Sequence, residues 1–468
     1  MPEQIELQYP GFYQAMATLR QLPIPQSKSS NGVTSGFRDS AFTKNRELPV
    51  HRWVPWIAGF SAQFVDDCLS TYLSGSTPNA AWVLDPFAGV GTTLLESFIQ
   101  GFNVVGFEIN PYAALASITK LQAHEIPPCT LREGIHSFSK FMQNSLRSNK
   151  GIPASGRPEG FSGRTEFFSP AVERKVLFAL DYINGVRDTA IRNLFRLAFG
   201  SVMVSFSNYS YEPSLTRRVA VGKEPITEFD VEAAIRKKLL LMAEDIEWLR
   251  STVRKNGSPP KANIQVDSFF TAPVKLRRKA FVDLLVTSPP YLNNYHYPRN
   301  TRPQLHWLGF ASGPGYEGAR ESISFGTFWQ TVRNKKPVKL CFDLPELAEA
   351  IVRVRQMNAE RGPYGGPGWA NYIATYFNDA FQFWTVAASL LKPKSAAIIV
   401  LGNSIIQGVE IKTDQLFGQI AEQCGFTFEE TIRLREKRTG TSIIQSSVRV
   451  RKAALRTALY ESAIVLRK

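Results

Sequence analysis

Short apolar runs and longer helical stripes alternate along this chain of 468 residues. The runs 82–84 and 281–286 are rich in β-branched and aromatic residues and end at turn residues, which is typical of buried strands. Similar runs lie at 103–107, 263–267, 396–403, 427–434 and 462–467. Helical periodicity predicts helices over about 170–183, 190–206, 227–254 and 372–391. Because strands alternate with helices, the pattern predicts an α/β fold with a mostly parallel sheet.

The same pattern divides the chain into four parts. Residues 1–49 are polar and predict a loose N-terminal arm, whereas 50–120 carry strands, a turn and helices. Residues 121–258 are mainly helical, and strands resume in 259–468. Since the distance between the two strand-bearing parts is too long for one strand–helix–strand passage, we predict that 121–258 is an inserted helical region. Within the last part, 292–370 is expected to be irregular.

A stiff turn ends the apolar run 281–286. Thr287 and Ser288 are followed by two prolines and Tyr291, and each proline fixes its own φ and pushes the preceding residue toward extended geometry. Carbonyl oxygens, a hydroxyl and an aromatic ring suit a planar group with an amino substituent, such as a nucleic-acid base. Ligands bind at this end of the strands in an open α/β sheet. Pro-Pro-Tyr also occurs in linkers, but a linker does not normally follow a buried strand.

A second signal follows the first predicted strand. Asp85-Pro86-Phe87-Ala88-Gly89-Val90-Gly91-Thr92-Thr93 is a small-residue turn that opens a helix. Glycines allow the backbone to approach a ligand closely, and the helix start supplies free N–H groups. Glu108 ends the next strand, roughly 20 residues after Asp85, the spacing at which a carboxylate reaches ribose hydroxyls. An ordinary strand–helix–strand unit with a tight turn is the alternative interpretation.

Together these motifs resemble those of the S-adenosylmethionine-dependent DNA amino-methyltransferases of bacterial restriction-modification systems. The resemblance covers about 50–120 and 260–310, with weaker support after 370. It implies a Rossmann-like class I methyltransferase fold: a mostly parallel seven-stranded sheet with one antiparallel strand near its edge and helices on both faces. Residues 50–120 would form the cofactor-binding half and 259–468 the catalytic half. For S-adenosylmethionine we predict contacts from Ser61, Asp85, Phe87, Gly89, Gly91, Thr92, Thr93, Glu108 and Asp267.

The resemblance assigns the target amine to the turn formed by Ser288, Pro289, Pro290 and Tyr291. Serine before Pro-Pro-Tyr is similar to the N4-cytosine branch, so we predict an enzyme that methylates N4 of a flipped cytosine. The alternatives are N6-adenine methylation, RNA guanine-N2 methylation, and a DNA-binding subunit that keeps the fold without activity. RNA guanine enzymes usually place Asp before Pro-Pro-Tyr, and an inactive subunit should show damaged motifs, whereas both motifs are intact here.

A net charge of +15 favours a polyanionic partner, which we predict to be double-stranded DNA. The excess is concentrated in 431–468, where Lys437 and Arg438 precede small hydroxyl residues that can add phosphate hydrogen bonds. A solvated basic face is the alternative. For contact with DNA we also predict Asn294, Tyr295, Arg299 and Arg302, within a candidate recognition loop at 292–370. The segment 207–218 is a second candidate.

Other classes of protein are disfavoured. The five histidines form no H-x-x-x-H pair, so no metal site is expected. There is no apolar stretch near the ~20 residues of a membrane span and no signal peptide, so a cytoplasmic protein without membrane contact is expected. A companion restriction endonuclease is an expected partner. The recognition sequence and the oligomeric state are left open by these patterns.

Overall fold

The computed structural model describes residues 27–28, 34–35, 37–38, 42–56, 59–147, 151–161, 166–212, 214–255, 257–293, 297–311, 313, 315–437 and 459–468. The strands of the main sheet are β3 (Trp82–Asp85), β4 (Asn103–Phe107), β7 (Ala262–Gln265), β8 (Val282–Thr287), β9 (Leu391–Leu401), β12 (Thr427–Lys437) and β13 (Leu459–Arg467). These seven strands pair in the order β12-β13-β9-β8-β3-β4-β7. Only β13, next to the β12 edge, runs antiparallel to its neighbours in this described sheet. The predicted mostly parallel seven-stranded sheet is confirmed.

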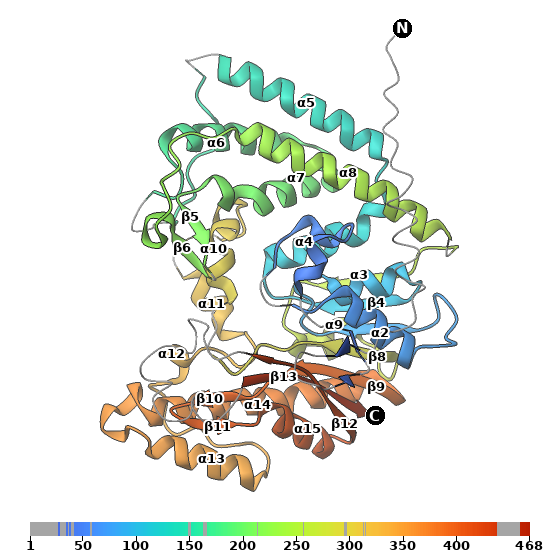
Figure 1. Ribbon diagram of the computed structural model, residues 1–468, viewed down its shortest axis with the longest axis vertical. Helices are drawn as coiled ribbons and strands as arrows, with labels where there is room; N and C mark the ends of the chain where they lie inside the picture. Colours follow the sequence, from blue (N-terminus) through green and yellow to red (C-terminus); the bar gives the residue numbers. More distant parts are fainter. Residues whose placement is uncertain are drawn as a thin grey trace.

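Helices cover both faces of the sheet because successive side chains of a buried strand point to opposite sides. Val83 and Leu284 pack toward α2 (Ala62–Tyr72), beside which α3 (Thr92–Ile99) and α4 (Pro111–Gln122) lie. Leu84 and Leu285 pack on the other face, against α14 (Gly366–Leu390) and α15 (Thr413–Gln423). Figure 1 shows the two helical layers on either side of the strands. The sheet is therefore the middle layer of three.

Four long helices fill much of the predicted inserted region: α5 (Pro128–Arg147), α6 (Pro170–Gly185), α7 (Thr189–Val202) and α8 (Val231–Lys255). Their buried side chains form one continuous apolar core with residues of α3 and α4, so they stack on the side of the sheet that α3 and α4 cover (Figure 1). Gly200 permits this contact, since a Cβ there would come within 2.5 Å of the Tyr112 ring. The buried carboxylate of Asp245 on α8 accepts hydrogen bonds from Val50, Arg52 and Trp53.

The segment 292–370 was predicted to be irregular, and this is wrong. It contains α10 (Tyr297–Trp307), α11 (Tyr316–Ser322), α12 (Trp329–Val332) and α13 (Pro345–Gln356). Prolines hid the periodicity: Pro303 lies inside α10, where proline normally disfavours a helix. Similarly, α14 begins at Gly366, ahead of the predicted start at 372. The sequence pattern missed this first turn because it contains glycine and proline, which are poor helix formers in a helix interior.

Smaller elements connect these layers. Two-stranded pairs are formed by β1 (Ser27–Lys28) with β2 (Thr34–Ser35), β5 (Tyr209–Tyr211) with β6 (Leu215–Arg217), and β10 (Ser404–Ile406) with β11 (Val409–Ile411). Short helices are η1 (Phe42–Arg46), η2 (His51–Trp53), η3 (Ala123–Glu125), η4 (Met203–Phe206), η5 (Arg218–Val221), η6 (Phe269–Thr271), α9 (Ala272–Leu276) and η7 (Ala359–Tyr364). Within the described ranges, no helix combines the length and apolarity required for a bilayer span.

Candidate active site

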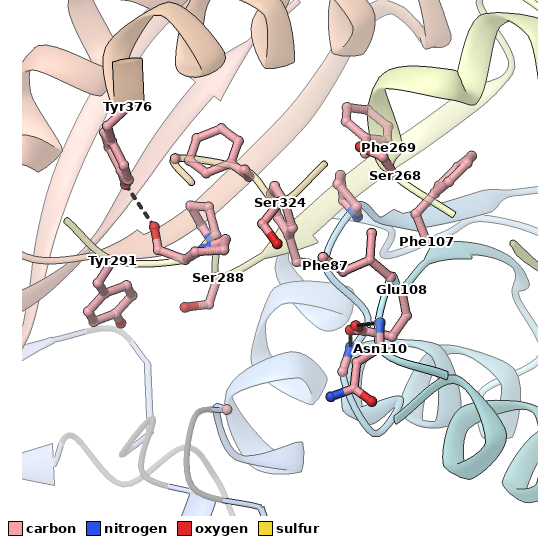
Figure 2. Close-up of a pocket in the computed structure, with 18 of the residues that line it drawn as sticks. Phe87, Phe107, Glu108, Asn110, Ser268, Phe269, Ser288, Tyr291, Ser324 and Tyr376 are labelled. Carbon is pink, nitrogen blue, oxygen red and sulfur yellow. Dashed lines mark hydrogen bonds between the residues drawn. The ribbon is translucent and has the colours of Figure 1, made fainter. Parts of the chain in front are cut away.

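A cavity of about 290 Å³ opens at the carboxyl ends of the parallel strands. The turn after β3 contributes Phe87 and Gly89, and the end of β4 contributes Glu108 and Asn110. The turn after β8 contributes Ser288, Pro289, Pro290, Tyr291 and Asn293. Figure 2 shows the side chains from these separate turns around one space. The two sequence motifs, almost two hundred residues apart, therefore share a single cavity, at the edge where open α/β sheets bind ligands.

The β3–α3 turn takes its shape from two glycines. Gly89 and Gly91 have φ of +51° and +83°, in the left-handed region that glycine adopts without strain. The Gly89 N–H donates to Oε2 of Glu108 at 2.8 Å, and the Asn110 N–H donates to Oε1 at 2.7 Å. These bonds fix the carboxylate of Glu108 in the cavity wall (Figure 2). Burial raises its pKa to about 7, although both backbone N–H groups oppose that shift.

Asp85 lies beneath this turn, outside the cavity wall. Its buried carboxylate accepts hydrogen bonds from the Thr287 hydroxyl at 2.6 Å and the Phe87 N–H at 3.0 Å. The Thr93 hydroxyl donates to the Val286 carbonyl at 3.4 Å. Burial raises the pKa of Asp85 to about 6. Asp85 and Thr93 therefore join the turn after β3 to the end of β8.

Asp267 belongs to the cavity wall but not to a strand. β7 ends at Gln265, two residues before Asp267, where the sequence predicted the strand to continue. Its carboxylate pairs with Lys275 at 3.0 Å and accepts the Ser268 N–H at 2.8 Å. Burial opposes ionisation, but the hydrogen bonds from Lys275, Ser268 and Thr271 together with the Lys275 charge outweigh it, and the pKa of Asp267 lies below its ordinary value. The side chain is an ionised acceptor at the cavity wall.

The Ser288–Tyr291 turn is fixed by side chains from other elements. Tyr376 of α14 donates its hydroxyl to the Pro290 carbonyl at 2.9 Å (Figure 2). The Tyr291 hydroxyl donates to Oε1 of Glu461 at 3.1 Å. The Asn293 N–H donates to the Tyr291 carbonyl at 2.7 Å. A turn fixed at several points is preorganised to hold a planar amine.

No family model matches the chain, but curated proteins do. The curated type II methyltransferase M.AvaI of Nostoc sp. (strain PCC 7120) is 24% identical over 419 residues, covering 84% of this chain and 82% of that protein. M.BsoBI of Geobacillus stearothermophilus is 24% identical over 446 residues, covering 86% and 83%. M.MvaI of Kocuria varians is 24% identical over 236 residues, about half of each chain.

Over most of its length the chain is therefore similar to type II methyltransferases, at low identity. S-adenosylmethionine is its methyl donor. Among solved structures, the methyltransferase is similar to the rRNA methyltransferase aviRa from Streptomyces viridochromogenes, at a TM-score of 0.30 and 11% identity over 88% of this chain and 87% of that one.

The cavity fits S-adenosylmethionine by its donor set. Glu108 presents a carboxylate to which two ribose hydroxyls can donate, and Asp267 presents a second to an amino group. Phe87, Phe107 and Phe269 add aromatic surface, and Gly89 leaves room that a side chain would fill toward Trp56, 3.4 Å from an added Cβ. These residues would hold the cofactor in the methyltransferase.

Not every predicted cofactor residue lies in the cavity wall. Ser61 is fully buried at the start of α2, where its hydroxyl accepts the Phe64 N–H, while its neighbours Gly59 and Phe60 line the cavity. Gly91 is the N-cap of α3, and Thr92 opens that helix. With Asp85 and Thr93, these residues shape the turn from behind, whereas Phe87, Gly89, Glu108 and Asp267 face the cavity.

Sequence reasoning missed a second wall of the cavity. The segment 323–328, Tyr372 and Tyr376, and the pair Arg435 and Glu461 line it. Gly326 has φ of +71° and donates its N–H to Asp379 at 2.8 Å. Burial raises the pKa of Asp379 to about 6. No local motif marks these residues, because each is placed by contacts to distant elements.

The predicted DNA contacts are placed only in part. Asn294, Tyr295 and Arg438 lie outside the described residues, and Lys437 is the last residue of β12. On α10, Arg299 is exposed and Arg302 lies over the Phe161 ring, 5.3 Å from its centre.

Arg435 lies within the basic segment 431–468 that was expected to contact phosphate; it lines the cavity and forms an ion pair with Glu461. Within the described ranges, no three His, Cys, Asp or Glu side chains cluster as metal ligands would.

Proposed function

We propose that this methyltransferase transfers a methyl group from S-adenosylmethionine to the exocyclic N4 amine of a cytosine in double-stranded DNA, as the modification enzyme of a restriction-modification system. The observation that carries the proposal is the shared cavity: the Ser288–Tyr291 turn and the Glu108 carboxylate line the same space. Relatives named type II methyltransferases match along more than four fifths of the chain.

The chemistry follows from the turn. An aromatic exocyclic amine is a weak nucleophile because its lone pair is delocalised into the ring. When the Ser288 hydroxyl and the Pro289 carbonyl accept its two N–H bonds, the nitrogen pyramidalises and directs its lone pair outward. S-adenosylmethionine, when bound, supplies a methyl group on a cationic sulfur that leaves as a neutral thioether without a metal. The amine forms the new N–C bond and releases one proton, so catalysis is mainly positioning and electrostatics.

The division of labour between the two prolines supports this assignment. The Pro290 carbonyl already accepts the Tyr376 hydroxyl at 2.9 Å. Pro289 therefore supplies the carbonyl that the amine uses, and Tyr376 fixes the plane of the turn. Since a base inside a duplex cannot enter such a cavity, the target base leaves the stack, and the Tyr291 ring packs on its face.

Ser288 favours cytosine over adenine in the proposed reaction. The alternative is N6-adenine methylation, because adenine presents the same kind of amine to the same turn. Contacts to the DNA are assigned to Asn294, Tyr295, Arg299 and Arg302 after the catalytic turn, and to phosphates by Lys437 and Arg438.

Mass spectrometry of nucleosides tests the proposal. Duplex DNA and RNA are each incubated with the protein and S-adenosylmethionine, with the Ser288→Ala variant as the control. N4-methylcytosine in the DNA, absent with the variant, is the expected result. N6-methyladenine alone would establish the alternative reaction, and methylguanine in RNA alone would contradict a DNA substrate.

A further inference from the structure

An ion pair between a buried carboxylate and a partly exposed guanidinium lies in the cavity wall beside the Ser288–Tyr291 turn. Glu461 of β13 is 4% exposed, and its Oε1 accepts the Tyr291 hydroxyl at 3.1 Å. Its Oε2 pairs with the guanidinium of Arg435 on β12, and both residues line the cavity. Neither residue belongs to the motifs that identify the family. The pair is thus a charged feature of the substrate cavity that the reaction described so far does not use.

A β-bulge turns Arg435 toward the cavity. Arg433 pairs with Ser462 and Arg435 with Glu461, so β12 has one extra residue between the two pairs. Because side chains alternate along a strand, Arg433 and Arg435 would otherwise share a face. The bulge places Arg435 on the Glu461 face, while Arg433 stays on the opposite face, 3.3 Å from the centre of the Tyr460 ring. Bulges are frequent next to active sites, where they redirect a side chain.

Stability alone does not account for the pair. Removing the Glu461 carboxylate from water costs free energy that its attraction to the 40% exposed Arg435 side chain only partly returns, and an apolar residue at such a position is often as stable. The rest of the Glu461 face continues with Ala463 and Val465, which are fully buried and apolar. An ion pair at the cavity end of an otherwise apolar strand therefore indicates a binding role.

We propose that Arg435 selects the target base by donating hydrogen bonds to the ring nitrogen N3 and the carbonyl oxygen O2 of cytosine, with Glu461 positioning both Arg435 and Tyr291. This inference rests on the proposed cytosine reaction. The Arg435 guanidinium is a planar fork of N–H donors that can give two parallel hydrogen bonds to adjacent acceptors, and its side chain is 40% exposed in the cavity wall. Cytosine presents two acceptors in sequence beside its amine. Adenine presents only N1 and then a C–H, so it loses one hydrogen bond in the same pose.

The test couples one atom of the base to one residue of the protein. The recognition sequence is first mapped by sequencing modified DNA, and duplexes are made with cytosine or 3-deazacytosine at the target position. The analogue keeps the amine and O2 but replaces the N3 acceptor with a C–H. Methylation rates at subsaturating DNA are compared for the wild type, Arg435→Met and the matched control Arg433→Met.

The wild type and Arg433→Met are expected to methylate 3-deazacytosine about ten- to a hundredfold more slowly than cytosine, the range for losing a good base contact. For Arg435→Met, the rates for the two bases are expected to differ by no more than about twofold beyond the difference in reactivity of the two amines themselves. The reason is that the side chain proposed to contact N3 is gone. The inference is overturned if the wild type methylates both bases equally, or if Arg435→Met keeps the full discrimination.

Controls separate folding and the parent proposal from this result. Arg435→Met leaves Glu461 without its cationic partner, so Arg435→Met/Glu461→Gln is measured in parallel, and calorimetry with S-adenosylmethionine shows whether each variant keeps its cofactor site. If neither variant binds the cofactor, the wild-type rates for cytosine and 3-deazacytosine test whether the N3 atom is recognised. A wild type that methylates only adenine overturns both proposals, whereas one that methylates cytosine without regard to N3 overturns this one alone.

Discussion

At the scale of single residues, the environment of each carboxylate determines what it can bind. Glu108 receives two backbone N–H groups yet is buried enough that its pKa rises to about 7. Asp267, whose hydrogen bonds and ion pair together outweigh burial, has a pKa below its ordinary value. Of these two carboxylates, only Glu108 should therefore change charge near neutral pH.

The affinity for S-adenosylmethionine should consequently depend on pH through Glu108. Ribose hydroxyls donate to the ionised carboxylate, so affinity should rise as the pH increases through about 7 and should level off about one pH unit higher. Burial favours the protonated carboxyl group of the folded protein. The contribution of Glu108 to stability is therefore fully present below its ordinary pKa of 4.5 and is lost as the pH rises through about 7. Calorimetry at several pH values measures the affinity. Glu108→Gln should remove the dependence, the exposed control Glu125→Gln should keep it, and a flat profile for the wild type would refute this role.

Ser288 should matter for methyl transfer and not for cofactor binding. Its hydroxyl is expected to accept one amine N–H, and loss of one such contact reduces rates by about a hundredfold or more. In Ser288→Ala, single-turnover methylation should fall by that factor while calorimetric affinity for S-adenosylmethionine is unchanged. Ser251→Ala, on the exposed side of α8, is the control. Retained activity in Ser288→Ala would remove the hydroxyl from the mechanism.

At the scale of elements, the cofactor turn depends on glycine conformation and on close packing with α4. Gly91→Ala should destabilise the protein more than Gly75→Ala, although the two have φ of +83° and +82°. An alanine Cβ at 91 would lie 2.9 Å from Oγ of Ser117, whereas nothing lies within 4 Å at 75. Strain at positive φ alone costs about 1 kcal/mol, and the clash adds to it at 91. Urea unfolding of both variants measures the difference, and equal losses would mean that α4 gives way freely.

Helix α14 should support the catalytic turn through one hydrogen bond. Tyr376→Phe removes the donor to the Pro290 carbonyl, so kcat should fall about tenfold, as expected for the loss of about 1.4 kcal/mol of positioning. Affinity for S-adenosylmethionine should not change. Tyr182→Phe is the matched control, because its hydroxyl donates to the Gly134 carbonyl at the same 2.9 Å in the helical region. If the two variants have equal kcat, Tyr376 does not act through the turn.

At the scale of the whole molecule, the sheet separates two basic edges. Lys437 ends β12 at the edge with the catalytic turn, whereas Lys394 and Lys468 lie near the opposite ends of the strands. Lys437→Gln/Arg438→Gln should weaken binding to specific and non-specific duplexes alike and reduce the log–log salt slope by about one to two. Lys394→Gln/Lys468→Gln changes the net charge equally and should leave the slope unchanged. A changed methylation sequence at constant slope would instead mark Lys437 and Arg438 as base contacts.

The features that depend on local chemistry could be predicted from the sequence. Asp85 to Thr93, Glu108, and Ser288 to Tyr291 were found because a turn, a strand end and a double proline constrain the backbone wherever they occur. Alternation of strands and helices gave the parallel sheet. It failed for 292–370, where Pro303 masks the periodicity of α10, whose residues are placed by packing onto the helical region.

The side chains that complete the cavity from distant elements are placed by tertiary contacts. Tyr376 of α14 and Glu461 of the last strand both contact the Ser288–Tyr291 turn. Arg435 has the charge that the sequence recognised, but a bulge determines that it faces the cavity and not the opposite side of the sheet. One extra residue in a strand reverses the face to which every later side chain points. This β-bulge is a property of the pairing between β12 and β13, so the residues of β12 alone do not reveal it.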